Sequence, residues 1–148
     1  MPRLDAERIA LWRELCTTSA RLQRAVDRTL TDVHGLPLAW FDVLTEIRNG
    51  GGSIRVHELC VALDEVPSSL SRRLDRMEHE GLVRRKATPR PDDRRAVTVS
   101  STPDGRAVWR DANISYRRMV QQHFAQRLTE TDIAALQRVW GKLASTSE

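Results

Sequence analysis

Apolar side chains recur every three or four residues along the start of the chain, which predicts one long helix over residues 5–33. Its apolar stripe consists of Ile9, Trp12, Cys16, Val26, Leu30 and Val33, widened by Leu15 and Leu22. Gly35 suits the end of this helix, and Pro37 suits the beginning of the next one. The second helix is predicted over residues 37–48, with an inward face of Leu38, Phe41, Leu44 and Ile47.

The middle of the chain carries the pattern of a helix-turn-helix. After a glycine-rich loop at 49–53, a short helix is predicted over 56–63, with the apolar positions Val56, Leu59, Cys60 and Leu63. A further helix is expected over 67–80, because Pro67 suits a first helical turn and Gly81 suits a stop. Its only apolar side chains are Leu70, Leu74 and Met77, and its opposite face carries Ser68, Arg72, Asp75, Arg76 and His79. A short helix, a tight turn and a helix with so thin an apolar stripe are typical of a helix-turn-helix.

Two β-biased runs follow the helix-turn-helix, at 82–88 and 95–101, and they flank a short stretch rich in proline and charge. Such runs on either side of a turn predict a β-hairpin. A hairpin that directly follows two helices makes a winged helix, so the charged stretch is expected at the tip of the wing.

The rest of the chain returns to helical spacing. Thr102 and Pro103 supply a helix cap and a first-turn proline for a helix over 103–127. The inward side chains expected on it are Val108, Trp109, Ala112, Tyr116, Met119, Val120 and Phe124. The sequence TETD at 129–132 resembles a capping box and begins a last helix. The inward residues expected there are Ile133, Leu136, Val139, Trp140 and Leu143.

The predicted fold class is therefore mainly α with a small β-hairpin wing, in a single chain of 148 residues. Residues 37–101 are expected to form a winged helix-turn-helix, a motif that binds DNA in many proteins. Residues 1–34 and 102–148 form a helical region with more apolar surface than the small central part can cover. We expect these helices to pack together and against a second copy of the chain, as a homodimer.

The positive charge is confined to the predicted winged helix. The whole chain has a net charge of +4 at pH 7, and residues 67–106 account for all of it. Their basic members are Arg72, Arg73, Arg76, Arg84, Arg85, Lys86, Arg90, Arg94, Arg95 and Arg106, against six acids. A local excess of this kind favours a polyanionic partner, here double-stranded DNA.

Other classes of protein are disfavoured by the sequence. No apolar run approaches the roughly 20 residues that span a bilayer, so no membrane partner is expected. The charged N-terminus is unlike a signal peptide, and Cys16 and Cys60 form no close pair, so we expect a reduced, cytoplasmic protein. No catalytic motif assembles, which argues against an enzyme, and the four histidines have no metal spacing, so no metal or cofactor is predicted.

Several motifs in register resemble the MarR (multiple antibiotic resistance regulator) family of bacterial transcription factors. The most specific part is 68–105, where a serine-rich helix precedes Met77-Glu78, Gly81-Leu82-Val83, Arg85, Asp93-Arg94-Arg95, a strand at 97–99 and the run 102–105. Residues 36–44 also match the family's second helix. The resemblance implies a homodimeric winged helix-turn-helix repressor that a small ligand or oxidation releases from DNA.

The helix at 67–80 is the expected reader of the DNA major groove. Ser68, Ser69 and Ser71 allow close approach to bases or phosphates, and Arg72, Arg73 and Arg76 can reach phosphate or a guanine edge. The alternative is a solvated helix face whose charges pair locally, for example Arg72 with Asp75 or Arg76 with Glu80.

The wing is the expected second contact with DNA. Pro89 and Pro91 restrict its backbone, and Asp92 and Asp93 are placed to orient the neighbouring arginines. Arg94 or Arg95 can then enter a minor groove, and the resemblance favours Arg95, paired with Asp93. Lys86 and Arg90 are expected on phosphates. The alternative is a cluster of salt bridges that neutralises itself.

Two further sites are considered for the signal that the protein senses. A pocket for a small aromatic ligand, where the protein has one, is expected where the long helices meet the winged helix, with Trp12, Trp40, Phe41, Trp109 and Tyr116 as candidates to line it. Core packing is the simpler role for each of these residues. Cys16 resembles in position the reactive cysteine of the family's peroxide-sensing branch. It lacks that branch's neighbouring tyrosines and lies on the apolar stripe, where a buried, inert thiol is normal.

The leading hypothesis is a dimeric repressor on a pseudo-palindromic operator, released by a small ligand. The first alternative is a thiol-based redox-sensing repressor acting through Cys16. The second is a basic protein that coats nucleic acid without sequence preference, which would show steep salt dependence.

Overall fold

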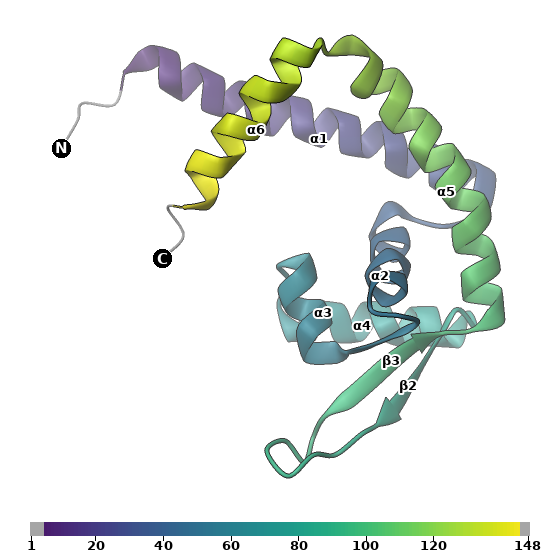
Figure 1. Ribbon diagram of the computed structural model, residues 1–148. Coiled ribbons are helices and arrows are strands. Elements are labelled where there is room, and N and C mark those ends of the chain that lie inside the picture. The colour runs from purple at the N-terminus through teal and green to yellow at the C-terminus, as the bar shows by residue number, and fades with distance from the viewer. Residues whose placement is uncertain (1–4, 146–148) are drawn as a thin grey trace.

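The protein is described by a computed structural model that covers residues 5–145 (Figure 1). Its helices are α1 (Ala6–His34), α2 (Leu38–Asn49), α3 (Val56–Leu63), α4 (Pro67–His79), α5 (Pro103–His123) and α6 (Glu130–Ala144). Its strands are β1 (Ser53–Arg55), β2 (Val83–Ala87) and β3 (Val97–Ser101). Residues 1–4 and 146–148, which belong to the predicted dimerisation region, lie outside the described part.

The predicted helix boundaries are confirmed at residues that favour the beginning or the end of a helix. Gly35 ends α1 in the left-handed conformation, at φ 62° and ψ 21°, which glycine adopts without steric cost. Pro67 occupies the first turn of α4. The Thr102 side chain accepts a hydrogen bond from the Gly105 amide at 3.0 Å and so begins α5. Thr129 and Asp132 form the capping box of α6.

The winged helix forms around one apolar core beneath α2 and α4. Leu70, Leu74 and Met77, the whole apolar stripe of α4, are fully buried. They pack into a cluster that includes Leu44 of α2 and Val99 of β3. The thin stripe therefore fixes which face of α4 points outward, and the serine and arginine face is left to solvent.

The sheet has three strands where the sequence predicted a two-stranded hairpin. β2 and β3 pair antiparallel as expected, and β1 pairs with the other edge of β3, giving the order β1-β3-β2. Residues 53–55 were predicted as the end of a loop and the approach to a helix. Their three-residue strand is held by hydrogen bonds to β3, a distant partner that local periodicity does not report.

The helix after the wing is shorter than predicted. α5 ends at His123 instead of residue 127, and residues Ala125–Arg127 form a separate 3₁₀ turn. Phe124 between them leaves the helical region, at φ −129° and ψ −70°. As a result the chain changes direction before α6, and Phe124, expected to face inward, is exposed.

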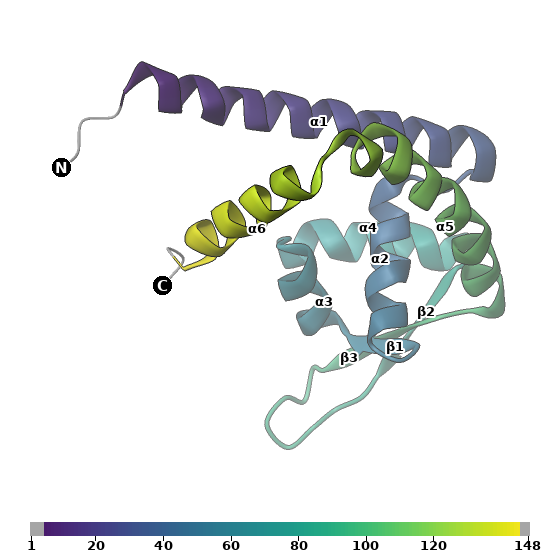
Figure 2. The ribbon, with the colours of Figure 1, turned by 45° about the horizontal axis from the view of Figure 1, so that its top comes forward.

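One end of the molecule carries long helical faces that the described chain does not cover. α6 has no buried residue, and it packs closely on no other element of residues 5–145. α6 crosses in front of α1 in Figure 1, but the turned view of Figure 2 shows a gap between the two ribbons. Most side chains predicted to face inward there are exposed in the single chain, including Trp12 at 65%, Trp140 at 46% and Leu143 at 54%, while Ile133 and Leu136 are partly buried.

Across residues 5–145, no helix combines the length and apolar character needed to cross a bilayer.

Candidate nucleic-acid interface

The outer face of α4 presents short polar side chains and unpaired arginines. Ser68, Ser69, Ser71, Arg72 and Arg76 are all exposed. The local pairs considered above, Arg72 with Asp75 and Arg76 with Glu80, do not form. Within residues 5–145, Arg72 and Arg76 take part in no ion pair. Both guanidinium groups are therefore free to bind an anion.

Arg73 differs from its neighbours on α4. Its guanidinium pairs with Glu65 at 2.7 Å, and its side chain is only 13% exposed. Glu65 lies just before α4, so the pair ties α4 to the turn that precedes it. A DNA contact by Arg73, as predicted, requires that this ion pair open.

A second charge cluster joins α4 to the wing. Arg85 of β2 donates from Nε to Glu78 at 3.0 Å and also pairs with Asp75, both on α4. Glu78 accepts the backbone N–H of Arg85 as well, at 3.1 Å. Although partial burial lowers the pKa of Arg85, its hydrogen bonds to Asp75 and Glu78 outweigh that effect and raise the pKa. The sequence identified Arg85 as a family position but did not show that it couples the helix to the wing.

The wing tip is a compact turn organised by Asp93. The Arg90 and Asp93 backbones exchange two hydrogen bonds, of 2.7 and 3.1 Å. The Asp93 side chain accepts the backbone N–H of Arg95 at 3.0 Å and pairs with Arg55 of β1 at 3.4 Å. The predicted association of Asp93 with Arg95 thus involves the Arg95 backbone, not its guanidinium. Arg55 was missed because the strand that carries it was not predicted.

The basic side chains of the wing point into solvent. Lys86, Arg90, Arg94 and Arg95 are exposed, and in the described part of the chain none of them is in an ion pair. The same holds for Asp92, so the tip is not a cluster of salt bridges that neutralises itself. These unpaired basic side chains lie on two elements that follow each other, the outer face of α4 and the wing.

The five aromatic residues predicted to line a ligand site do not meet in one place. Phe41 stacks on Tyr116, with ring centroids 4.7 Å apart, and on Trp109, with centroids 6.1 Å apart. Phe41 is 2% exposed and belongs to the core, with Trp40 partly buried against it. Trp12 lies on the uncovered part of α1, away from this cluster.

A groove nevertheless exists where the long helices meet the winged helix. It measures about 300 Å³ and lies between α1, α2 and α5, with Val26, Asp42 and Tyr116 among its walls. Burial raises the pKa of the Asp42 carboxyl, an effect that nearby Arg73 opposes and that Glu46 and Glu65 reinforce. Asp42 was not singled out from the sequence, because an acid inside a helix usually faces solvent.

Cys16 is exposed in the single chain, whereas the apolar stripe predicted a buried thiol. Ile9, Trp12 and Leu15 on the same part of α1 are also exposed, so the stripe meets solvent there. Tyr116 lies with Phe41 in the core and not beside Cys16. Cys60 is buried, as a packing role requires.

The fold and its basic surface define a winged helix-turn-helix DNA-binding protein, and known proteins agree. The MarR family model matches residues 34–96. The chain is 32% identical over 124 residues to the HTH-type transcriptional regulator PecS of Dickeya dadantii, covering 82% of this chain and 69% of PecS. It is 33% identical over 103 residues to the multiple antibiotic resistance protein MarR of Salmonella typhimurium, covering 70% and 69%.

A solved structure extends the similarity over almost the whole chain. Sco3205, a MarR family transcriptional regulator from Streptomyces coelicolor determined in complex with DNA, superposes with a TM-score of 0.88 and 27% identity. The match covers 99% of this chain and 91% of Sco3205. The chain belongs to the MarR family, whose members are transcriptional regulators and not enzymes.

Proposed function

We propose that the protein is a homodimeric repressor that binds a pseudo-palindromic operator through two recognition helices and two wings. The observation that carries the proposal is the set of exposed, unpaired basic side chains on α4 and the wing. Since basic charge elsewhere in the chain is balanced by acids, this surface is the natural place for the phosphate backbone.

Each element has a distinct task in this proposal. α4 lies in the major groove, where Ser68, Ser69 and Ser71 permit close approach and Arg72 and Arg76 bind phosphate or a guanine edge. Arg73 holds the helix in place through Glu65 and contacts DNA when that pair opens. Arg94 or Arg95 enters the minor groove, and Lys86 and Arg90 bind phosphates on either side.

The apolar faces at the chain ends support the homodimer. α6 and the first turns of α1 expose large apolar side chains along helical stripes, in a pattern unlike the scattered exposure of a monomer's surface. A second copy covers these faces by a two-fold axis and sets two recognition helices about one DNA turn apart. Residues 1–34 and 102–148 are the dimerisation region of this proposal, and 37–101 the DNA-binding region.

The proposal also covers whether the protein represses or activates, and what releases it from DNA. A protein that occupies promoter DNA represses by exclusion, whereas activation needs a further contact with the transcription machinery. The groove beside Asp42 and Tyr116 is the proposed place for a small aromatic ligand that releases the DNA, because it joins the helical region to the winged helix. Such a regulator acts in the cytoplasm, where the DNA is.

The test is DNA binding at near-physiological salt, with the region upstream of the protein's own gene compared with a scrambled duplex of equal length. A specific regulator favours its site by about 10³-fold or more. Arg95→Ala should weaken operator binding, with a loss of about 1–3 kcal/mol, whereas Arg110→Ala on α5 should leave it unchanged. A preference near one, with steep salt dependence, would instead identify a protein that coats nucleic acid.

The thiol-switch alternative depends on whether Cys16 stays accessible. Cys16 lies among the apolar side chains that the proposed dimer covers, so we expect peroxide to leave DNA binding unchanged. DNA release by peroxide that is abolished in Cys16→Ser would establish the alternative.

A further inference from the structure

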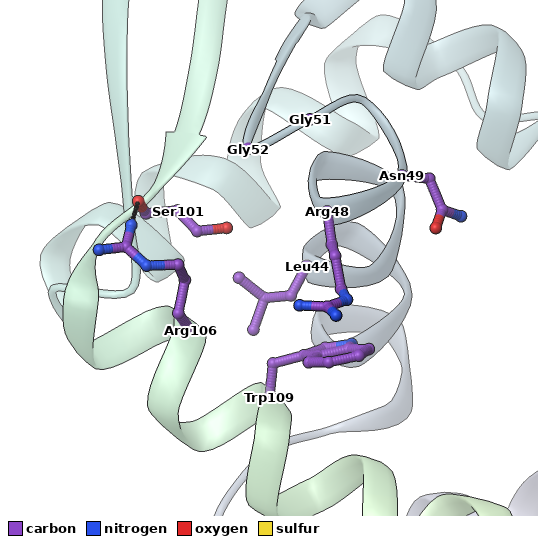
Figure 3. Close-up of a pocket in the computed structure, with 8 residues that line it drawn as sticks. All are labelled: Leu44, Arg48, Asn49, Gly51, Gly52, Ser101, Arg106 and Trp109. Atoms are coloured by element: carbon purple, nitrogen blue, oxygen red, sulfur yellow. Dashed lines mark hydrogen bonds between the residues drawn. The ribbon is translucent and has the colours of Figure 1, made fainter.

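A second hollow, of about 380 Å³, lies at the foot of the wing, between the end of α2 and the beginning of α5 (Figure 3). Arg48 of α2 and Arg106 of α5 stand on opposite sides of it, with the Leu44 side chain between them. The glycine loop at 51–52 and Ser101, the last residue of β3, complete its wall. None of the side chains proposed to contact DNA lines this pocket.

The pocket carries two positive charges and no acid. Its lining includes no carboxylate, and neither arginine takes part in an ion pair with any described residue. Arg106 donates one hydrogen bond, from Nη1 to the Ser101 carbonyl at 2.9 Å, and keeps its other donors free. Arg48 lies over the Trp109 ring at 4.5 Å from its centroid. Two guanidinium groups that face one hollow without a counter-ion favour an anionic occupant.

The surrounding structure limits what the rest of that occupant can be. The Trp109 indole donates a hydrogen bond to Thr45 Oγ1 at 2.9 Å. Its ring stacks nearly parallel to Phe41, and the Arg48 guanidinium lies over the same ring. The Arg48 guanidinium already lies over the indole in Figure 3, so it competes with any second ring that would stack there. Leu44 is only 1% exposed and offers an occupant almost no apolar surface, which favours an occupant with a polar body.

We propose that this pocket binds a small phosphate monoester, with the phosphate between Arg48 and Arg106. A monoester carries −1.5 to −2 charges at pH 7, which matches two guanidinium groups, and each group binds phosphate oxygens in a bidentate manner. A monocarboxylate would neutralise only one of them. The Ser101 hydroxyl, which points toward the hollow in Figure 3, is available to a hydroxyl of the ligand.

The site is separate from the proposed DNA surface and goes beyond the proposed function. A bound monoester would bridge α2 and α5 next to Ser101, the last residue of β3 before α5 begins. It would therefore brace the base of the wing without covering α4.

The test is calorimetric titration of the full chain with glucose 6-phosphate and glycerol 3-phosphate, beside glucose and benzoate as controls. At least one monoester should bind, and both controls should bind at least tenfold more weakly. Affinity for the monoester should fall as the pH drops below about 6, where the second phosphate proton returns. Failure of both monoesters to bind, or equal binding of benzoate, would overturn the proposal.

Three variants locate the binding. Arg48→Gln and Arg106→Gln should each reduce affinity for the monoester by about tenfold or more, because each loses a charge-assisted contact. Arg110→Gln, one turn further along α5, is the matched control and should bind as the wild type does. Thermal unfolding of each variant shows that it is folded. If Arg48→Gln does not fold, Arg106→Gln, which leaves the Trp109 contact intact, decides the question.

The same variants distinguish this proposal from an additional DNA contact. The monoester titration contains no DNA, so it succeeds or fails independently of operator binding. Loss of operator affinity in Arg48→Gln and Arg106→Gln, together with unchanged monoester affinity, would assign the two arginines to the DNA backbone and overturn the monoester site.

Discussion

At the scale of single residues, Gly105 shows how closely two segments approach. A Cβ on Gly105 would lie 2.0 Å from the Leu82 carbonyl oxygen, which also accepts the Thr102 amide at 3.0 Å. Because that oxygen is backbone and already bonded, it cannot move aside cheaply. Gly105→Ala should therefore lower the free energy of unfolding by about 1–3 kcal/mol or more, as measured by urea denaturation.

Gly141 of α6 provides the matched control for this substitution. It is also a helical glycine, but a Cβ there meets nothing within 4 Å. Gly141→Ala should gain up to about 1 kcal/mol from reduced backbone entropy. Equal effects of the two alanines would show that the contact with Leu82 does not limit residue 105.

Asp42 is a residue whose charge the fold opposes. Burial raises the pKa of its carboxyl above the ordinary 3.8, so the native chain keeps the proton to a higher pH than the unfolded chain does. Stability therefore falls as the pH rises through the interval between the two pKa values and is lower at every pH above it. Asp42→Asn removes this cost and should raise the urea midpoint at pH 7, with a smaller gain as the pH approaches 4. A lower midpoint at pH 7 would mean that attraction to Arg73 outweighs burial.

At the scale of elements, the α4–wing junction depends on Arg85. Its side chain bonds both Asp75 and Glu78 of α4 from its place on β2. Arg85→Met should lower the free energy of unfolding by about 1–2 kcal/mol and weaken operator binding, because the wing is then less firmly held relative to α4. The neighbouring Arg84→Met, exposed and outside every ion pair of residues 5–145, should change stability by less than about 0.5 kcal/mol. Equal losses in the two variants would refute the junction role.

The elements that the sequence predicted correctly are those with local signals. Gly35, Pro67, Thr102 and the capping box at Thr129 each mark a boundary through their own backbone preference or side-chain cap, and each boundary is confirmed. β1 was missed because pairing with β3 alone makes those residues a strand. The early end of α5 was also missed for lack of a local signal, because the sequence around Phe124 contains no glycine or proline that would predict a helix end.

The candidate site shows the same division. Which face of α4 points outward follows from three apolar positions, so the sequence could assign its exposed serines and arginines. Which arginine is free and which is paired depends on residues distant in the chain. Glu65 holds Arg73, and Arg55 on the unpredicted strand holds Asp93. The hollow between Arg48 and Arg106 likewise joins two helices far apart in sequence, and no local pattern indicates it.

At the scale of the whole molecule, the exposed faces of α1 and α6 predict that one chain is an incomplete unit. Leu143 and Trp140 lie on α6, which contributes no buried residue to the chain's own core. Leu143→Glu therefore costs the single chain little, but it places a charge in the proposed interface between two copies. Sedimentation should show the wild type at twice the 16.9 kDa of one chain and Leu143→Glu at the mass of one.

The control for the dimer is Val61→Glu on α3, an apolar residue that is even more exposed than Leu143 and lies in the winged helix. It should leave the mass at two chains. Because two half-sites bind together only when the recognition helices are joined, Leu143→Glu should also lose most of its affinity for the full operator while retaining weak binding to one half-site. A wild type that sediments as one chain, or a Leu143→Glu variant that remains a dimer, would place the interface elsewhere. The apolar faces of α1 and α6, which the sequence predicted to be buried, would then need another partner.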